Sequence, residues 1–201
     1  MSFVVSGTDT DIGKTIFCAG LCGFLGMPYW KPVQSGLDAQ TDGDVVAALA
    51  GVTILPEAYR LKRPLSPHQS AAEEGVTIDT LSLMPPAGDA VIEGAGGVMV
   101  PLRDDTLYID VFARWKLPVI LVARTRLGTI NHSLLSLEAL RARDIPVHGI
   151  AFVGDANDEN ERIICAKGGV KRLGRLPLID PLTPENLKTA FAAAFVKSDF
   201  I

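Results

Sequence analysis

Residues 7–15, GTDTDIGKT, resemble the phosphate-binding loop G-x-x-x-x-G-K-[S/T], with five residues instead of four between the two glycines. An apolar stretch precedes the loop and a helical pattern follows it, which is the context that the motif requires. Backbone N–H groups of such a loop surround phosphate oxygens, Lys14 would reach the β- and γ-phosphates, and the Thr15 hydroxyl would ligate Mg²⁺. The sequence therefore predicts a site for a nucleoside triphosphate with magnesium.

Other polar residues are placed to act beside the transferred phosphate. Thr10 and Asp11 would face the γ-phosphate or a substrate next to it, although both types are also common in turns. Lys31 lies near the carboxyl end of a predicted strand and is held extended by Pro32, so it could neutralise a phosphoryl group in transfer rather than lie in solvent. Ser35 could donate to a bound substrate or form a turn.

Magnesium bound beside a triphosphate needs one or two carboxylates as well as the loop hydroxyl. Glu93 ends the apolar run AVIE before the flexible GAGG, where such an acid is expected. Asp44 lies at the start of a predicted helix, where an N-cap role is the alternative and Asp42 competes with it. We expect Thr15, Asp44 and Glu93 to bind the metal, with the choice between Asp42 and Asp44 left open.

Short apolar strands alternate with helical patterns, which predicts an α/β fold with a mostly parallel sheet covered by helices on both faces. The expected strands cover residues 3–6, 29–33, 90–93, 118–123, 147–153 and 172–177. The expected helices cover residues 14–25, 43–50, 67–74, 107–115, 131–143, 158–166 and 184–196. Active sites of such sheets lie at the carboxyl ends of the strands, where the phosphate loop, KPVQSG and EGAGG fall. We expect one domain over residues 1–201.

The composition is that of a globular protein, with 201 residues of which 48% are hydrophobic and 21% are charged. A net charge of −4 without any Lys/Arg block argues against nucleic acid or a membrane as a partner. The absence of a signal peptide or a long apolar run predicts a cytoplasmic protein. Cys18 and Cys22 are expected to be small core residues rather than a metal or redox pair.

Eight stretches that occur in sequence span nearly the whole chain: GTDTDIGKT, KPVQSG, GD at 43–44, SPH at 66–68, EGAGG followed by VPL, PVILVA, LGTINH and PENL. In this order they resemble the dethiobiotin synthetase family of P-loop NTPases. The resemblance implies an ATP-dependent ligase that joins CO₂ to 7,8-diaminononanoate and closes the ring of dethiobiotin in biotin biosynthesis. It also implies Mg²⁺, a carbamate, a carbamic-phosphoric anhydride, and a homodimer whose active site lies at the subunit interface.

The resemblance assigns roles residue by residue. Lys31 would lie between carbamate and γ-phosphate, with Thr10 and Lys14 as its catalytic partners, and Ser35 would bind the diamine. The nucleotide would contact Asp11, Ile12, Gly13, Lys14, Thr15, Ile16, Gly154, Asp155, Leu176, Pro177 and Leu178. The substrate's tail carboxylate would be bound across the interface by a helix N-terminus made of Gly128, Thr129, Ile130 and Asn131. Asn131 could also be an N-cap, and a monomer should be inactive.

One position departs from the family. Where members typically carry an Asn that reads the nucleotide base, this chain has Gly154 followed by Asp155, with Asn157 two residues beyond. Glycine offers no side-chain amide, so we expect weak discrimination between ATP and other triphosphates. Asp11 also stands where members often have another residue, such as Glu.

Two other functions remain as alternatives. A related amide-forming synthase, such as a corrinoid a,c-diamide synthase, usually carries a second glutaminase domain with a nucleophilic Cys, for which 201 residues leave no room. A nucleotide switch of the cell-division or partition type often has a further lysine near the start of the loop, where this chain has Thr8. ATP hydrolysis that responds to DNA or lipid rather than to a diamine would favour the switch.

Overall fold

The computed structural model describes residues 1–38 and 40–201. Its main sheet has seven strands in the order β11-β10-β9-β1-β6-β2-β4, and every neighbouring pair is parallel. These strands are β1 (Phe3–Gly7), β2 (Tyr29–Trp30), β4 (Ile54–Leu55), β6 (Val91–Gly97), β9 (Val119–Arg124), β10 (Val147–Val153) and β11 (Arg172–Leu176). The predicted parallel α/β sheet is confirmed.

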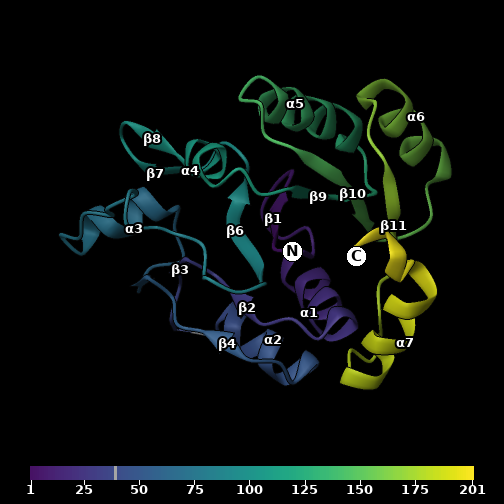
Figure 1. The fold of residues 1–201 in the computed structure, drawn as a ribbon, viewed down its shortest axis with the longest axis horizontal. Helices are drawn as coiled ribbons and strands as arrows, with labels where there is room; N and C mark the ends of the chain where they lie inside the picture. Colours follow the sequence, from purple (N-terminus) through teal and green to yellow (C-terminus); the bar gives the residue numbers. More distant parts are fainter. Residues whose placement is uncertain (39) are drawn as a thin grey trace.

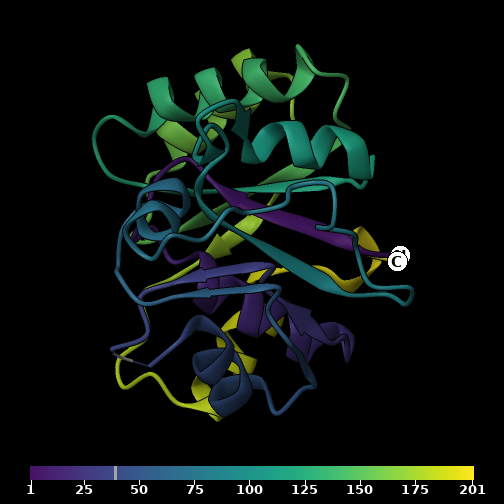
Figure 2. The same ribbon diagram turned by 90° about the vertical axis from the view of Figure 1, so that its left-hand side faces the viewer.

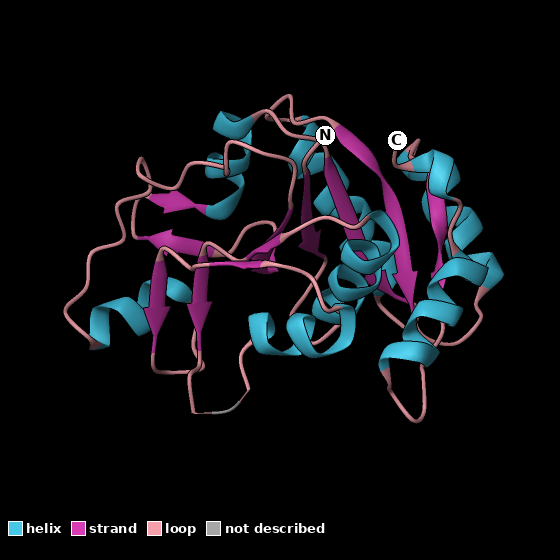
Figure 3. Cartoon of the chain, turned by 60° about the horizontal axis from the view of Figure 1, so that its bottom comes forward, coloured by secondary structure: helices cyan, strands magenta, loops and turns pink. Residues whose placement is uncertain are grey.

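Four short strands form two small sheets outside the main one (Figure 3). They are β3 (Val33–Ser35) paired in parallel with β5 (Tyr59–Leu61), and β7 (Pro101–Arg103) paired antiparallel with β8 (Thr106–Leu107). The β3–β5 pair carries Ser35 toward the phosphate loop, so it extends the wall of the site beyond the main sheet.

Helices cover both faces of the main sheet (Figures 1 and 2). One face packs against α4 (Tyr108–Trp115), α5 (Thr129–Arg141) and α6 (Asp158–Gly168), and the other packs against α1 (Lys14–Leu25), α2 (Asp42–Ala50) and α7 (Pro184–Ala194). The remaining helices are α3 (Pro67–Glu73) and a 3-10 turn over Lys197–Asp199. In the described part of the chain, no helix has both the length and the apolar composition needed to cross a membrane.

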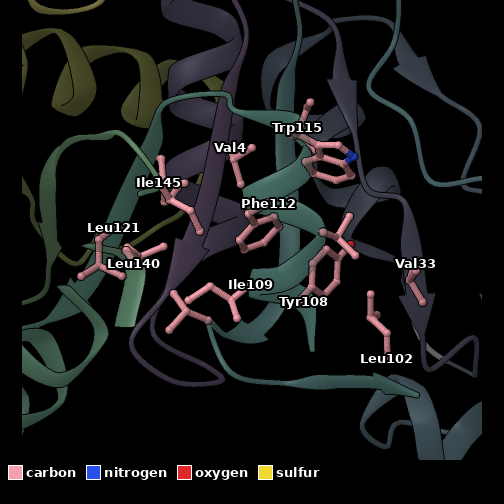
Figure 4. Close-up of a cluster of buried hydrophobic side chains, with 14 of the residues drawn as sticks. Val4, Val33, Leu102, Tyr108, Ile109, Phe112, Trp115, Leu121, Leu140 and Ile145 are labelled. Carbon is pink, nitrogen blue, oxygen red and sulfur yellow. The ribbon is translucent and has the colours of Figure 1, made fainter. Parts of the chain in front are cut away.

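Two hydrophobic cores follow from the alternation of side chains along the strands. In β1, Val4 points into the core that holds Phe112 of α4, whereas Phe3 and Val5 point into the core that holds Phe17 of α1. Figure 4 shows the first of these cores, where Tyr108, Phe112 and Trp115 of α4 cluster near Val4. Cys18 and Cys22 are fully buried in the second core, among apolar neighbours.

Two predicted strands differ from those in the structure. The run 29–33 is interrupted, because Pro32 has no N–H for a ladder and its carbonyl instead accepts from the backbone of Ala58 and Tyr59 at 2.9 and 3.0 Å. Lys31 therefore lies in the gap between β2 and β3. The strand that contains Glu93 continues to Gly97, which places Glu93 opposite Val5 within β6 rather than at a strand end.

One predicted helix boundary also moves. Helix α5 begins at Thr129, because Gly128 takes the left-handed conformation at φ 91° and turns the chain into the helix. Asn131 therefore lies in the first turn of α5 and is not its N-cap.

Helix α1 offers a matched test of the packing between α1 and α7. A Cβ at Gly20 would overlap the ring of Phe191, whereas a Cβ at Gly23 would meet only Ala50 at ordinary contact distance, 3.7 Å. We expect Gly20→Ala to lower the free energy of unfolding by about 1–3 kcal/mol. Gly23→Ala should raise it by up to about 1 kcal/mol through helix propensity. Urea unfolding measures both, and equal effects of the two substitutions would contradict this packing.

Candidate active site

The carboxyl edge of the sheet holds a cavity of about 620 Å³ next to the phosphate loop. The structure brings the following predicted residues to its wall: Thr10, Asp11, Ile12, Gly13, Lys14, Thr15, Ile16, Lys31, Ser35 and Glu93. Asp42, the predicted alternative to Asp44, also lines it, and residues that carried no predicted role in chemistry complete it: Pro64, Leu65, Ser66, Pro67, Ala95, Gly96 and Val100. The motif SPH marked part of this second group, but nothing local in the sequence placed the segment from 64 to 67 opposite the phosphate loop.

The phosphate loop is held by close packing and by an ion pair. Gly13 has φ 90° and lies against β10, where a Cβ would come within 2.7 Å of Val153. The Lys14 ammonium folds back and donates to the carbonyl of Asp9 at 2.9 Å. The Asp9 carboxylate in turn accepts from Arg124 at the end of β9, at 3.0 Å. The loop is therefore tied to two neighbouring strands before any phosphate binds.

Below the loop, four polar side chains from four different segments meet. The Thr15 hydroxyl donates to Asp42 Oδ1 at 2.6 Å and lies 3.0 Å from Glu93 Oε1. The Lys31 ammonium forms an ion pair with Asp42 and lies 3.5 Å from Glu93 Oε1. Glu93 and Lys31 are buried, with exposed fractions of 1% and 7%, and Asp42 is partly exposed to the cavity.

Mutual attraction keeps Lys31 and Asp42 charged. Burial alone would lower the pKa of Lys31, but Glu93 and Asp42 outweigh burial and raise it above its ordinary value. Burial alone would raise the pKa of Asp42, but the charge of Lys31 and the hydrogen bonds from Lys31 and Thr15 lower it. Lys31 is therefore an ammonium and Asp42 a carboxylate at neutral pH.

The predicted choice of Asp44 as a metal ligand does not fit the structure. Helix α2 begins at Asp42, one residue earlier than expected, so Thr41 is the N-cap and Asp44 is the third helical residue. The Asp44 carboxylate accepts from the Thr41 N–H at 3.0 Å and from its hydroxyl at 2.6 Å, and lies outside the cavity. Thr41-x-x-Asp44 is a capping-box spacing, which was the signal available in the sequence. Asp42 takes the place that we expected for Asp44.

The donor set around Thr15 fits magnesium. Thr15, Asp42 and Glu93 offer one hydroxyl and two carboxylates, all hard oxygen ligands, and both carboxylates lie within hydrogen-bonding distance of the Thr15 hydroxyl. Over the described residues, no group of three or more His, Cys, Asp or Glu side chains could hold a metal ion by itself. A site with two carboxylates suits Mg²⁺, which usually takes one or two carboxylates and completes its shell with water and substrate phosphates.

A smaller cavity of about 280 Å³ lies on the far side of the phosphate loop, between the ends of β9 and β10. It is lined by Asp11, Ile12, Gly13, Arg124, Thr125, Arg126, Val153, Gly154, Asp155 and Leu178. Of the predicted nucleotide contacts, Pro177 is exposed and is not among these residues, and the carbonyl of Leu176 already accepts from Gly154 N at 3.0 Å.

Packing at Gly154 excludes a side chain there. Gly154 has φ 131°, and a Cβ on it would come within 2.6 Å of Thr125 Oγ1. The amide of Asn157 does not substitute for a side chain at 154, because it donates to the carbonyl of Thr125 at 3.3 Å while its oxygen caps α6. No side-chain amide therefore projects into this cavity from these two positions.

The segment from Gly128 to Asn131 lies apart from the cavity of its own chain. The Thr129 hydroxyl is buried and donates to the carbonyl of Arg124, whereas Leu127 is 99% exposed and Asn131 is also exposed. Gly128 has no side chain to cap α5, and the N–H of Thr129 donates to the carbonyl of Arg126 at 3.2 Å. Within one chain, this segment and the main cavity form separate features.

Comparison with known proteins gives consistent matches. The family model described as an AAA domain matches residues 1–186. The chain is 59% identical to the ATP-dependent dethiobiotin synthetase BioD of Sphingopyxis alaskensis, over 98% of each chain. It is 62% identical to the protein of the same name from Rhodopseudomonas palustris, over 98% of this chain and 97% of the relative.

Solved structures are similar at much lower identity. The MinC:MinD cell division protein complex of Aquifex aeolicus matches with a TM-score of 0.54 at 10% identity, covering 94% of this chain and 86% of that one. A ParA family ATPase of Chlorobium tepidum TLS matches with a TM-score of 0.53 at 11% identity, covering 96% and 90%. These likenesses concern the fold alone.

The ion pair between Lys31 and Asp42 predicts a specific pH dependence. Because the pKa of Asp42 is lowered in the folded state, its contribution to stability is present above its ordinary pKa of 3.8 and is lost as pH falls through the folded value. We expect Asp42→Asn to be less stable than wild type at pH 6, with the difference shrinking below pH 3.8. Urea unfolding at pH 6 and below pH 3.8 measures the difference in the free energy of unfolding between wild type and Asp42→Asn. A difference that does not depend on pH would contradict the ion pair.

Proposed function

Because the chain belongs to the dethiobiotin synthetase family, we propose that it uses ATP and CO₂ to close the ring of dethiobiotin on 7,8-diaminononanoate. The observation that carries this proposal is the pair of lysines, Lys14 and Lys31, that face one cavity together with the hydroxyl and two carboxylates below the phosphate loop. We propose that a single domain, residues 1–201, carries this site.

The proposed reaction has three steps. One amine of the diamine adds to CO₂ and loses a proton, which gives a carbamate. A carbamate oxygen then attacks the γ-phosphorus of ATP, the bond to the β-phosphate oxygen breaks, and ADP leaves. The second amine finally attacks the carbonyl carbon of the carbamic-phosphoric anhydride, the C–O bond breaks, and phosphate leaves as the ring closes and the amine loses its proton.

Lys14 and Lys31 would offset the electrostatic repulsion between the two anions of the second step. Carbamate and triphosphate are both anions, so their approach costs Coulomb energy that nearby cations must offset. Lys31 would lie between the two anions, Lys14 would bind the β- and γ-phosphates, and Thr10 would orient the reacting groups. The lowered pKa of Lys14 follows from its burial, so its ammonium is poorly solvated and gains from an anionic partner.

Thr15, Asp42 and Glu93 would hold Mg²⁺ in this proposal. The ion would neutralise charge on the bridging phosphates of ATP. Asp42 is paired with Lys31 in the free chain, so a cation bound near Asp42 would compete with that pair.

The diamine would lie along the opposite wall of the cavity. Ser35 Oγ is buried and, within the described part of the chain, has no hydrogen-bond partner, which supports its role as a contact for the diamine. The start of α5, where Gly128 and Asn131 are exposed, suits the tail carboxylate of substrate bound to a second subunit, through the segment Gly128–Asn131. We therefore propose a homodimer in which each active site is completed by its partner.

The free cysteines and the need for ATP support the same cellular location. Cys18, Cys22 and Cys165 are free thiols, which is usual in a reducing compartment, and we propose a cytoplasmic location, where ATP is supplied.

Phosphate release tests the proposed activity. With Mg-ATP and bicarbonate, wild-type protein should release phosphate only when 7,8-diaminononanoate is present, and mass spectrometry should find the cyclic urea product. Lys31→Met should lower kcat/KM about 10²–10³-fold, because it removes a cation from the developing negative charge. Lys188→Met, at an exposed lysine of α7, is the matched control. Release that ignores the diamine, or that responds to DNA or lipid, would refute the synthetase and favour a nucleotide switch.

The absence of a side-chain amide at Gly154 predicts weak discrimination between nucleotide bases. A site built around a side-chain amide can reject a wrong partner about 10⁴-fold, whereas the cavity beside Thr125 presents none from positions 154 and 157. We expect ATP, GTP and CTP at equal concentration to support diamine-dependent phosphate release at rates within about tenfold of one another. A response to ATP alone would show that other groups select adenine.

A further inference from the structure

Tyr29 makes a contact with Glu93 that no step above uses. Its hydroxyl donates to Glu93 Oε2 at 2.8 Å, and both side chains are buried, with exposed fractions of 0% and 1%. The other carboxylate oxygen, Oε1, is the one that faces Thr15 and Lys31. The two oxygens of Glu93 therefore have separate partners, with Oε2 turned into the core and Oε1 turned toward the cavity.

The short strand β2 supplies this arrangement by its alternation. Tyr29 belongs to the core that contains α1, whereas Trp30 points to the opposite core and packs on Trp115, with ring centroids 6.0 Å apart. Lys31 follows on the same side as Tyr29. Residues 29 and 31 thus place one donor on each oxygen of Glu93, from a single stretch of three residues.

We propose that Tyr29 is a positioning residue that holds Glu93 with Oε1 directed at the magnesium-nucleotide site. A buried carboxylate oxygen without a donor is costly, so loss of the Tyr29 hydroxyl would favour rotation of the Glu93 carboxylate away from its present orientation. Groups that hydrogen-bond a metal ligand typically change metal affinity about 10–100-fold when removed. The proposal rests on the proposed function only through the magnesium site at Thr15, Asp42 and Glu93.

Tyr29→Phe tests this role, because it removes one oxygen and keeps the ring in the core. Tyr108→Phe is a matched control: Tyr108 is fully buried in the other core, and its hydroxyl has no hydrogen-bond partner in the described part of the chain. The probe is Mn²⁺, titrated by electron paramagnetic resonance into full-length protein saturated with ADP. ADP binding in EDTA and urea unfolding are measured on each variant as readouts of the loop and of the fold.

The expected result is a dissociation constant for Mn²⁺ that rises about 10–100-fold in Tyr29→Phe and is unchanged in Tyr108→Phe. ADP binding in EDTA should stay within about twofold of wild type, since the phosphate loop does not depend on Tyr29. In a Glu93→Gln background, Tyr29→Phe should weaken Mn²⁺ binding no further, because its effect passes through Glu93.

Mn²⁺ affinity within twofold of wild type in Tyr29→Phe would overturn the proposal. A loss of ADP affinity in EDTA as large as the loss of Mn²⁺ affinity would also overturn it, because it would mean that the phosphate loop itself had been damaged. Wild-type protein that binds no Mn²⁺ with ADP would overturn the magnesium site and this inference together. The assay contains no diamine, so its outcome is independent of whether the proposed ring closure takes place.

Discussion

The balance of charge beneath the phosphate loop is the constraint on which the rest of the site depends. Lys31 lies between β2 and β3, Asp42 begins α2, and Glu93 lies within β6, so their attraction joins three parts of the fold. Thr15 at the start of α1 hydrogen-bonds into the same group. Each charge is partly or fully removed from water, and leaving one unpaired would be strongly destabilising. A charged side chain of this group can exchange one oppositely charged partner for another, but it cannot lose a partner without a replacement.

This constraint links binding to chemistry. A divalent cation gathered by the two carboxylates and the phosphates would supply the positive charge that Lys31 now supplies to Asp42. The Lys31 ammonium would then be available to an anion in the cavity, at the point where two anionic substrates must meet. In this account the ion pair of the free chain holds Lys31 in place until metal and substrate arrive. Tyr29 keeps the second carboxylate, Glu93, aimed at the same point.

Sequence alone was sufficient for features set by local spacing. The loop motif was enough to place Thr15 and Lys14 at the cavity, and the position of Lys31 near the carboxyl end of a predicted parallel strand was enough to place it there too. The choice between Asp42 and Asp44 could not be predicted, because it depends on which residue begins α2, and boundaries depend on how the cap is hydrogen-bonded. The spacing from Thr41 to Asp44 is that of a capping box, so the sequence also supported a capping role for Asp44 beside the interpretation as a metal ligand.

Other features depended on tertiary contacts that no local pattern encodes. Tyr29 contacts a residue 64 positions away, and the contact exists only because β2 and β6 pair in one register. The interruption at Pro32 has a local cause, yet the position of Lys31 between two sheets follows from the pairing of β3 with β5 rather than with β6. At Gly154, the sequence showed that a side chain was missing, but only the packing showed that Thr125 excludes one.

A crystal structure with Mg²⁺ and a non-hydrolysable ATP analogue would show whether Lys31 exchanges Asp42 for the nucleotide. We expect the metal among Thr15, Asp42, Glu93 and the phosphates, with Lys31 released from Asp42 and turned toward the γ-phosphate. A metal bound through Asp44, or Lys31 still paired with Asp42 while the metal sits elsewhere, would contradict this expectation.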